Sequence, residues 1–167
     1  SLSSLLKNMA KGFNEKVTLT QELDFLRDYV VIEKVRYLEL FDLQIQVDEP
    51  ALYDAKIIKL TLQPLVENAI FNGIEPSGRP GLIEIRAWAE EDVLKVSVTD
   101  NGIGMAQEQV DRLLTDTSRV TKSTMSGIGL PNVDRRFKLV YGEEYGLTIE
   151  SQLDCFTRIT VALPLEV

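Results

Sequence analysis

The stretch Asp100-Asn-Gly-Ile-Gly-Met105 places a carboxylate and two glycines directly after a strand pattern. In the preceding run, Leu94–Thr99, apolar and polar residues alternate, which predicts a strand with one buried face. Glycine adopts positive φ angles easily and lets a ligand approach the backbone closely. Asp100 can therefore accept a hydrogen bond from an exocyclic amine at the mouth of a pocket. The same residues are also typical of an ordinary turn, and this stretch alone leaves both interpretations open.

Composition restricts the class of function. The chain has 167 residues and a formal net charge of -8, which argues against nucleic acid and anionic membranes as primary partners. It contains no histidine and one cysteine, Cys155. Histidine-based metal sites, histidine general bases and a structural zinc site are therefore not expected, and any bound metal should be a hard cation with oxygen ligands.

Hydrophobic periodicity and turn residues predict the other elements. Helices are expected over residues 1–12, 20–37, 55–72, 107–114 and between Gly129 and Gly142, and strands over 43–47, 82–89, 93–99, 147–151 and 157–163. Thr18 and Gln21 have the spacing of a capping box, while Pro64 predicts a kink or a helix start. Residues 75–81 read as a loop. This order indicates an α+β fold, a two-layer α/β sandwich whose mixed, mainly antiparallel sheet is covered by helices on one face.

Three further features suit a nucleotide. Asn68 lies on the margin of an apolar helical stripe, so its amide either bonds to backbone or offers an oxygen to a cation. Gly127 and Gly129 precede a helix, whose free N–H groups favour an anion. The segment 105–126 ends in a serine- and threonine-rich run without periodicity, which can close over a ligand. Together with Asp100, these features bracket a base, a metal and a phosphate.

The chain resembles the catalytic region of sensor histidine kinases. Leu62-Gln-Pro-Leu-Val-Glu-Asn-Ala-Ile70 resembles their N box, and Asp100–Gly104 resembles their first glycine box. Gly127-Ile-Gly-Leu-Pro-Asn-Val133, followed by Tyr141-Gly142, resembles the second. The Leu-Gln-Pro-Leu-Val-Glu-Asn run is similar to that of the LytS/YehU-like group, and the resemblance covers essentially the whole chain.

This resemblance implies the Bergerat ATP-binding fold, with ATP and Mg²⁺ as cofactors. It implies that Asp100 binds the adenine amino group and that Gly102 and Gly104 admit the adenine and the base of the lid. Thr157 matches a threonine that supports the water bound to adenine. Asn68 is expected to coordinate Mg²⁺.

The phosphates would be covered from the second glycine box. There the resemblance assigns Gly127, Gly129 and Leu130 to the phosphates and residues 105–126 to the ATP lid.

The resemblance also implies a domain organisation and partners. Residues 1–17 look like the end of the dimerisation and phosphoacceptor region, 18–47 like a connector helix and first strand, and 48–167 like the catalytic domain. The γ-phosphoryl of ATP would pass to a histidine outside this chain and then to a response regulator. We expect a cytoplasmic domain of a homodimeric parent that is anchored in the bacterial inner membrane.

The chain departs from the group's pattern after the N box. Phe71 and Asn72 stand where a basic residue and a histidine are usual, so Asn72 becomes a candidate nucleotide contact. Lys122 or Arg119 of the lid is expected to replace the missing cation. A nucleotide-binding or scaffolding module without catalysis is the alternative that this departure suggests. A serine kinase of the anti-sigma-factor type is disfavoured by the amphipathic N-terminal helices.

A second departure concerns the general base. Gyrase- and Hsp90-like ATPases have a catalytic glutamate four residues before the asparagine, where this chain has Pro64. Proline cannot act as a base, which favours a kinase over self-contained hydrolysis. Glu67, next to Asn68, is a candidate for proton transfer or Mg²⁺ contact, and the alternative is a carboxylate at the surface or one that contacts the site's residues without touching the ligand.

Overall fold

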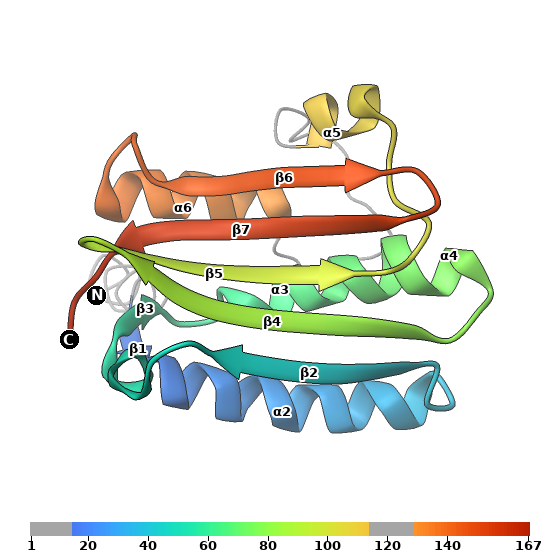
Figure 1. Cartoon of the computed structure of the whole chain (residues 1–167), viewed down its shortest axis with the longest axis horizontal. Helices are drawn as coiled ribbons and strands as arrows, with labels where there is room; N and C mark the ends of the chain where they lie inside the picture. The colour runs from blue at the N-terminus through green and yellow to red at the C-terminus, as the bar shows by residue number, and fades with distance from the viewer. Residues whose placement is uncertain (1–14, 114–128) are drawn as a thin grey trace, which may run out of the picture.

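Alternating apolar residues build a five-stranded sheet in the computed structural model, which describes residues 15–113 and 129–167. The strand order is β2-β4-β5-β7-β6. Their bounds are β2 Phe41–Val47, β4 Gly81–Glu90, β5 Val93–Asp100, β6 Gly146–Gln152 and β7 Phe156–Pro164. β2 runs parallel to β4, and the other neighbouring pairs are antiparallel. The mixed, mainly antiparallel sheet of an α+β fold is confirmed (Figure 1).

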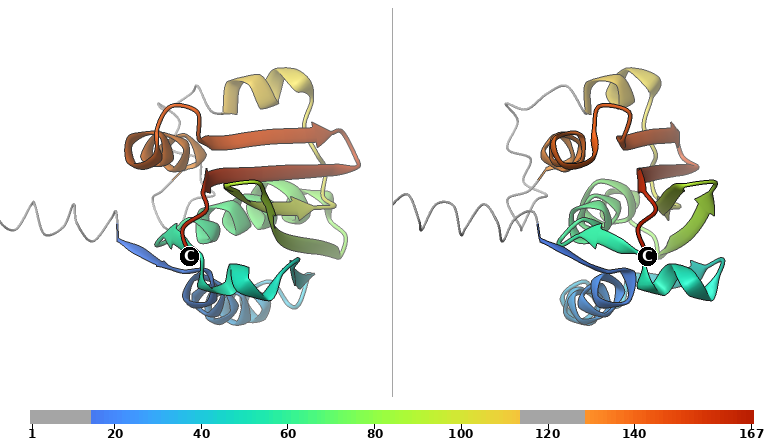
Figure 2. Two further views of the ribbon diagram at one scale, coloured as in Figure 1. Left: turned by 60° about the vertical axis from the view of Figure 1, so that its left-hand side comes forward. Right: turned by 90° about the vertical axis from the view of Figure 1, so that its left-hand side faces the viewer.

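Helices cover one face of this sheet. They are α2 (Leu19–Arg36), α3 (Leu62–Asn68) and α6 (Leu130–Tyr141), all on the same side in Figures 1 and 2. The register aligns Ile85, Val98 and Ile159 across three strands, and all three side chains are buried beneath the helices. Because successive side chains of a strand point to opposite faces, polar neighbours such as Glu84 and Arg158 lie on the open face.

The start of α2 follows the expected capping box. The Thr18 hydroxyl accepts a hydrogen bond from the Gln21 N–H at 3.1 Å, and the Gln21 side-chain oxygen accepts from the Thr18 N–H at 2.9 Å. These bonds satisfy N–H groups that the first helical turn leaves without partners. Leu19, Leu23 and Leu26 then bury one face of the helix.

The expected helix over residues 55–72 is wrong at its start. Lys56–Ile58 forms the strand β3, which pairs antiparallel with β1 (Lys16–Thr18). Ile57 and Ile58 are fully buried, so pairing and burial override the helical spacing of the local sequence. α3 begins only at Leu62, close to Pro64, as the proline indicated.

The helical path continues past α3 with a wider turn. Ala69–Ile74 forms the π-helical segment η2, followed by α4 at Glu75–Ser77. The predicted loop at 75–81 is therefore wrong at its beginning, and the turn comes at Gly78, which has φ +68°. Ahead of α3, Pro50–Asp54 forms the 3₁₀ helix η1.

The remaining expectations are confirmed where the structure describes the chain. α5 spans Gln107–Leu113, and α6 carries Pro131 in its first turn and ends at Gly142. The helix expected over 1–12 and most of the segment 105–126 lie outside the described residues. Within the described ranges, no helix combines the length and apolarity that crossing a bilayer demands.

Candidate functional site

Asp100 ends β5 as a buried carboxylate that is 2% exposed. Its Oδ1 accepts a hydrogen bond from the Gly102 N–H at 2.9 Å. Burial raises the pKa of Asp100 to about 6, and the bond from Gly102 opposes that shift. A buried carboxylate has room for several donors, so an acidic group served by one backbone N–H can accept more from a ligand.

Two glycines bring η2 against Asp100. A side chain at Gly73 would collide with the Asp100 carboxylate, and one at Gly102 would collide with the Gly73 backbone. The Ile103 N–H donates to the Gly73 carbonyl at 3.0 Å, which ties the two segments together. Sequence reasoning missed Gly73. Its signal is a glycine inside a helical pattern, which often marks close packing.

The absence of a side chain at Gly102 and Gly104 has a cause within the protein. Gly104 has φ +65°, and a Cβ there would run into the Gln152 carbonyl. Protein backbone thus occupies the space beside both glycines. The contacts with adenine and with the lid that were expected of them stay predictions.

Thr157 lies opposite Asp100 in the register of β5 and β7. Its hydroxyl is 2.8 Å from the Ser151 hydroxyl on β6, which itself donates to the Phe156 carbonyl at 2.8 Å. Because Ser151 has one proton to give, Thr157 donates to Ser151. Ser151 also accepts from the Met105 N–H at 2.8 Å and so holds the segment after Gly104. No sequence pattern indicated this role for Ser151.

Asn68 and Asn72 lie one turn apart at the junction of α3 and η2. The Asn72 amide donates to the Asn68 Oδ1 at 2.9 Å. The alternative that Asn68 bonds to backbone is thus replaced by a side-chain partner. Gly73 follows Asn72 directly, so the same helical path leads from both amides to the residue that packs against the Asp100 carboxylate.

Glu67 is fully buried, so its interpretation as a surface carboxylate is wrong. Its Oε1 accepts from the Gln63 side chain at 3.1 Å. Burial first, and then the charge of Glu67, raise the pKa of Tyr29 on α2. Burial also raises the pKa of Glu33, with Glu67 adding to the shift and Arg36 opposing it. Glu67 thus lies close to the Tyr29 and Glu33 side chains of α2, and its part in proton transfer or Mg²⁺ contact stays a prediction.

The start of α6 is described from Gly129 onward. The Gly129 carbonyl accepts hydrogen bonds from the N–H groups of Asn132 and Val133 at 3.1 and 3.2 Å. Among residues 15–113 and 129–167, a Cβ at Gly129 would meet the Pro131 ring alone, at an ordinary 3.6 Å. Leu130, expected to cover phosphates, is buried. Lys122 and Gly127 lie outside the described residues.

A magnesium ion fits the donor set at Asn68. Among residues 15–113 and 129–167, no three Asp, Glu, His or Cys side chains gather to hold a metal by themselves. Mg²⁺ usually takes one or two protein oxygens and completes its shell with phosphates and water. The Asn68 amide oxygen is a hard donor of this kind, and its role as a Mg²⁺ ligand stays a prediction.

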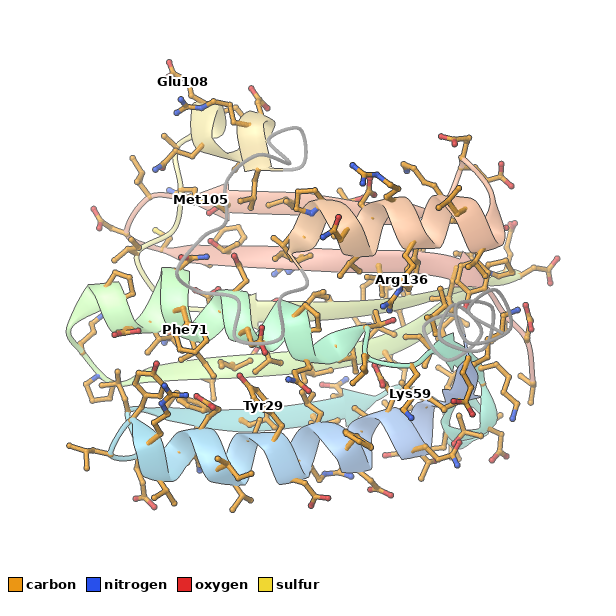
Figure 3. All side chains as sticks on the ribbon, turned by 180° about the vertical axis from the view of Figure 1, so that it is seen from behind. Tyr29, Lys59, Phe71, Met105, Glu108 and Arg136 are labelled. Atoms are coloured by element: carbon orange, nitrogen blue, oxygen red, sulfur yellow. The ribbon has the colours of Figure 1, made fainter. Side chains whose placement is uncertain are left out.

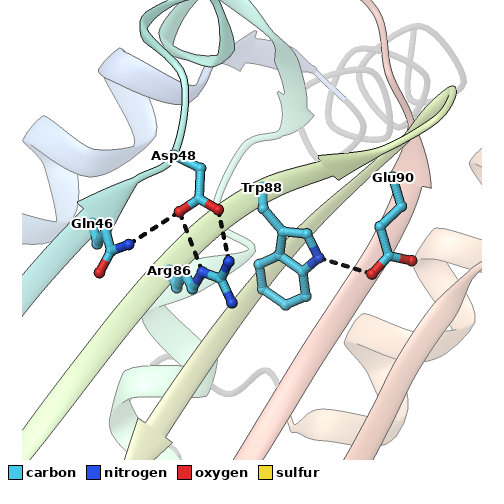
Figure 4. A network of polar contacts seen from close by, with 5 residues as sticks. All are labelled: Gln46, Asp48, Arg86, Trp88 and Glu90. Atoms are coloured by element: carbon cyan, nitrogen blue, oxygen red, sulfur yellow. Dashed lines mark hydrogen bonds and ion pairs between the residues drawn. The ribbon is translucent and has the colours of Figure 1, made fainter.

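A groove of about 780 Å³ crosses the opposite, open face of the sheet. Its lining includes Arg86 and Trp88, whose guanidinium and ring stack at 4.8 Å, but none of the expected site residues. Figure 4 shows Arg86 bound to Asp48 and the Trp88 ring N–H bound to Glu90. These charges are solvated and already paired, so we place the site at Asp100, where the buried carboxylate and the glycine contacts meet.

Known proteins resemble this chain in sequence. Residues 56–167 match the family described as histidine kinase-, DNA gyrase B-, and HSP90-like ATPase. The chain is 37% identical over 165 residues to the sensor histidine kinase YesM of Bacillus subtilis, covering 98% of this chain and 26% of YesM. It is 31% identical over 144 residues to the sensor protein LytS of Staphylococcus epidermidis, covering 86% and 24%. It thus spans about a quarter of the length of these relatives.

Solved structures share the fold. The catalytic domain of histidine kinase ThkA matches with a TM-score of 0.65 and 18% identity, covering 90% of this chain and 94% of that one. ThkA in complex with the response regulator TrrA matches with a TM-score of 0.61 and 18% identity, covering 99% and 47%. The expected Bergerat fold and the resemblance to the LytS/YehU-like group are confirmed.

Proposed function

Because the chain belongs to the family of histidine kinase-, DNA gyrase B- and HSP90-like ATPases, we propose that it is the ATP-binding catalytic domain of a sensor histidine kinase. The domain transfers the γ-phosphoryl group of ATP to a histidine outside this chain. The observation that carries the proposal is Asp100, a buried carboxylate with a raised pKa and one backbone donor. Residues 48–167 form the catalytic domain, 18–47 the connector and first strand, and 1–17 the end of the dimerisation region.

The chain's residues have distinct tasks in nucleotide binding. Above pH 6, Asp100 is mostly ionised and accepts a hydrogen bond from the exocyclic amine of adenine. Thr157 holds the water that is bound to adenine. Gly102 and Gly104 form one wall of the adenine pocket. Asn68 offers its amide oxygen to Mg²⁺, which when bound neutralises phosphate charge.

The phosphates lie toward the start of α6. Asn72 turns its amide from Asn68 to a phosphate oxygen, since an N–H donor suits either acceptor. Gly129, with Gly127 and Lys122 ahead of it in the chain, completes the phosphate contacts, and Leu130 anchors the start of α6 in the core.

The residues around Asn68 favour phosphoryl transfer over hydrolysis. Pro64 stands where a hydrolytic glutamate would activate water. Glu67 is buried and bonded to Gln63. Transfer to an imidazole depends mainly on positioning and charge neutralisation, which this arrangement supplies.

The remainder of the parent protein supplies the partners. A homodimeric parent, anchored in the bacterial inner membrane, presents the phosphoacceptor histidine to this cytoplasmic domain. The phosphoryl group then passes to a response regulator, and the ThkA complex with TrrA supports that partner class.

A module that binds nucleotide without transferring phosphate remains the alternative function. It rests on Phe71 and Asn72 in place of a basic residue and histidine. Phe71 packs edge-to-face on Tyr37, with ring centroids 5.6 Å apart. This packing gives the aromatic side chain at position 71 a structural role, so Phe71 is not evidence against catalysis and the kinase is the better conclusion.

Labelled ATP and the parent's full cytoplasmic portion test the proposal. We expect label on an upstream histidine in the wild type and its loss in Asn68→Ala. Calorimetry on Asn68→Ala should also show nucleotide binding that no longer responds to Mg²⁺. Nucleotide binding by the wild type without any label would support the non-catalytic module instead.

A further inference from the structure

The turn Lys59–Thr61 joins β3 to α3 and has an unusual backbone. Leu60 has φ +62°, in the left-handed region that leucine rarely adopts. Such a conformation persists where the surroundings hold it in place. The restraint comes from two side chains on other elements, Glu22 and Arg136.

Glu22 of α2 holds the N–H groups of this turn. Its Oε1 accepts from the Leu60 N–H at 3.0 Å. Its Oε2 accepts from the N–H groups of Thr61 and Leu62 at 2.8 and 2.9 Å. The carboxylate is 4% exposed, and it caps α3 with negative charge at the end where the helix dipole favours it.

Arg136 of α6 holds the carbonyl groups of the same turn. Its guanidinium donates to the Lys59 carbonyl at 3.0 Å and to the Leu60 carbonyl at 3.4 Å. Figure 3 labels Arg136 on α6 and Lys59 beyond it, on the segment that leads into α3. The turn is thus bound on its donor side by α2 and on its acceptor side by α6.

The two charges also stabilise each other. Burial raises the pKa of Glu22, and the three backbone N–H bonds and the charge of Arg136 oppose that shift. Burial lowers the pKa of Arg136, while the charge of Glu22 opposes this. Removing either charge leaves the other buried with less compensation.

Glu22, Arg136 and the turn Lys59–Thr61 together form a clamp, which lies between two parts of the proposed site. α3 runs from the clamped turn to Asn68, and α6 begins at Leu130, directly after Gly129. We infer that Glu22 and Arg136 are positioning residues that fix α3 relative to α6 through the shared turn and couple nucleotide affinity to α2. The inference rests on the proposed function, which makes Asn68 and the start of α6 contacts of ATP.

Calorimetry with Mg²⁺ and ATP on the 167-residue chain tests the coupling. Glu22→Gln and Arg136→Gln should each weaken binding about five- to tenfold, because α3 and α6 lose their common restraint. The double variant should bind about as weakly as either single variant, since both act on one turn. Circular dichroism sets a working temperature below the unfolding transition of every variant.

Thr61→Val is the matched control. The Thr61 hydroxyl donates to the Ile58 carbonyl at 2.6 Å, so it stabilises the same turn through a bond that involves neither Glu22 nor Arg136. The variant should unfold at lower temperature and bind ATP with unchanged affinity. Equal weakening by Thr61→Val would show mere loosening of the turn and overturn the inference.

Arg136→Lys separates charge from geometry and decides the matter if Glu22→Gln does not fold. Lysine keeps the charge beside Glu22 but lacks the planar fork, so it should restore part of the affinity that Arg136→Gln loses. Unchanged ATP affinity in Arg136→Gln would overturn this inference and leave the proposed function standing. A wild type that binds no ATP would instead overturn the proposed function, and the inference with it.

Discussion

Asp100 at the end of β5 and Glu22 near the start of α2 are both buried carboxylates whose pKa burial raises. Asp100 accepts one backbone N–H, from Gly102. Glu22 accepts three, from Leu60, Thr61 and Leu62, and also has Arg136 nearby. The protein therefore saturates one carboxylate and leaves acceptor capacity on the other. A buried acidic group with capacity to spare indicates a ligand site, whereas a saturated one indicates a structural joint.

Charges on the open face of the sheet follow a third pattern. Asp48 accepts two hydrogen bonds from Arg86, at 3.2 and 2.7 Å, and both groups are solvated (Figure 4). Exposed ion pairs contribute little to stability and are screened by salt. A groove lined by such pairs is therefore weaker evidence of function than the single buried carboxylate.

The largest expected effect would break the Asp100 region itself. Gly102→Ala should destabilise the chain by about 3 kcal/mol, because the new methyl group meets the Gly73 backbone, which cannot yield as a side chain can. Chemical denaturation followed by circular dichroism measures this.

Gly78→Ala is the control for Gly102→Ala. Gly78 has φ +68°, but no described residue lies within 4 Å of an added Cβ, so the cost of the substitution is conformational strain of about 1 kcal/mol. Equal losses in the two variants would show that backbone contact at Gly102 is unimportant.

Asp100→Asn should sharpen the contrast by separating binding from stability. ATP affinity should fall about 30- to 100-fold, because an amide donor replaces a charged acceptor facing the adenine amine. The fold should survive, since the amide oxygen still accepts from Gly102. Calorimetry measures the affinity, and unchanged binding would remove Asp100 from the adenine site.

The stability of Asp100→Asn should rise at pH 7. Between the ordinary carboxyl pKa of 3.8 and about 6, the folded state keeps a proton that the unfolded state releases, so wild-type stability falls as pH rises through that window. The loss is about 3 kcal/mol and is complete at pH 7. Denaturation at pH 7 and pH 4 should show the variant's advantage at pH 7 only; no advantage at pH 7 would contradict the raised pKa.

The smallest effect is a pH dependence of binding. Lowering the pH from 7 to 5 should weaken ATP binding about tenfold, because Asp100 gains a proton through its pKa of about 6 and loses acceptor strength. ATP itself titrates in this range, so the quantity to compare is the ratio of the ATP affinity of the wild type to that of Asp100→Asn. A ratio independent of pH would mean that Asp100 does not titrate at the adenine site.

Sequence patterns predicted the sheet and the capping box because both depend on neighbours within a few residues. The same local reading failed at Lys56–Ile58, where pairing with β1, 38 positions away in the register Lys56 to Thr18, reverses a helical pattern. It also missed Gly73, whose partner Asp100 lies on another element. Hydrophobic period specifies which face is buried but not which segment covers it.

The sequence by itself determined the five strands of the main sheet, the capped start of α2, the family and the three motifs, because alternation, caps and motif spacing are short-range properties. Only the tertiary structure decided that Gly73 backs Asp100, that Ser151 secures Thr157, and that Glu22 and Arg136 share one turn. Each of these contacts joins segments far apart in the chain. Their geometry depends on how the helices pack on the sheet, and a local sequence pattern does not specify which distant segments come into contact.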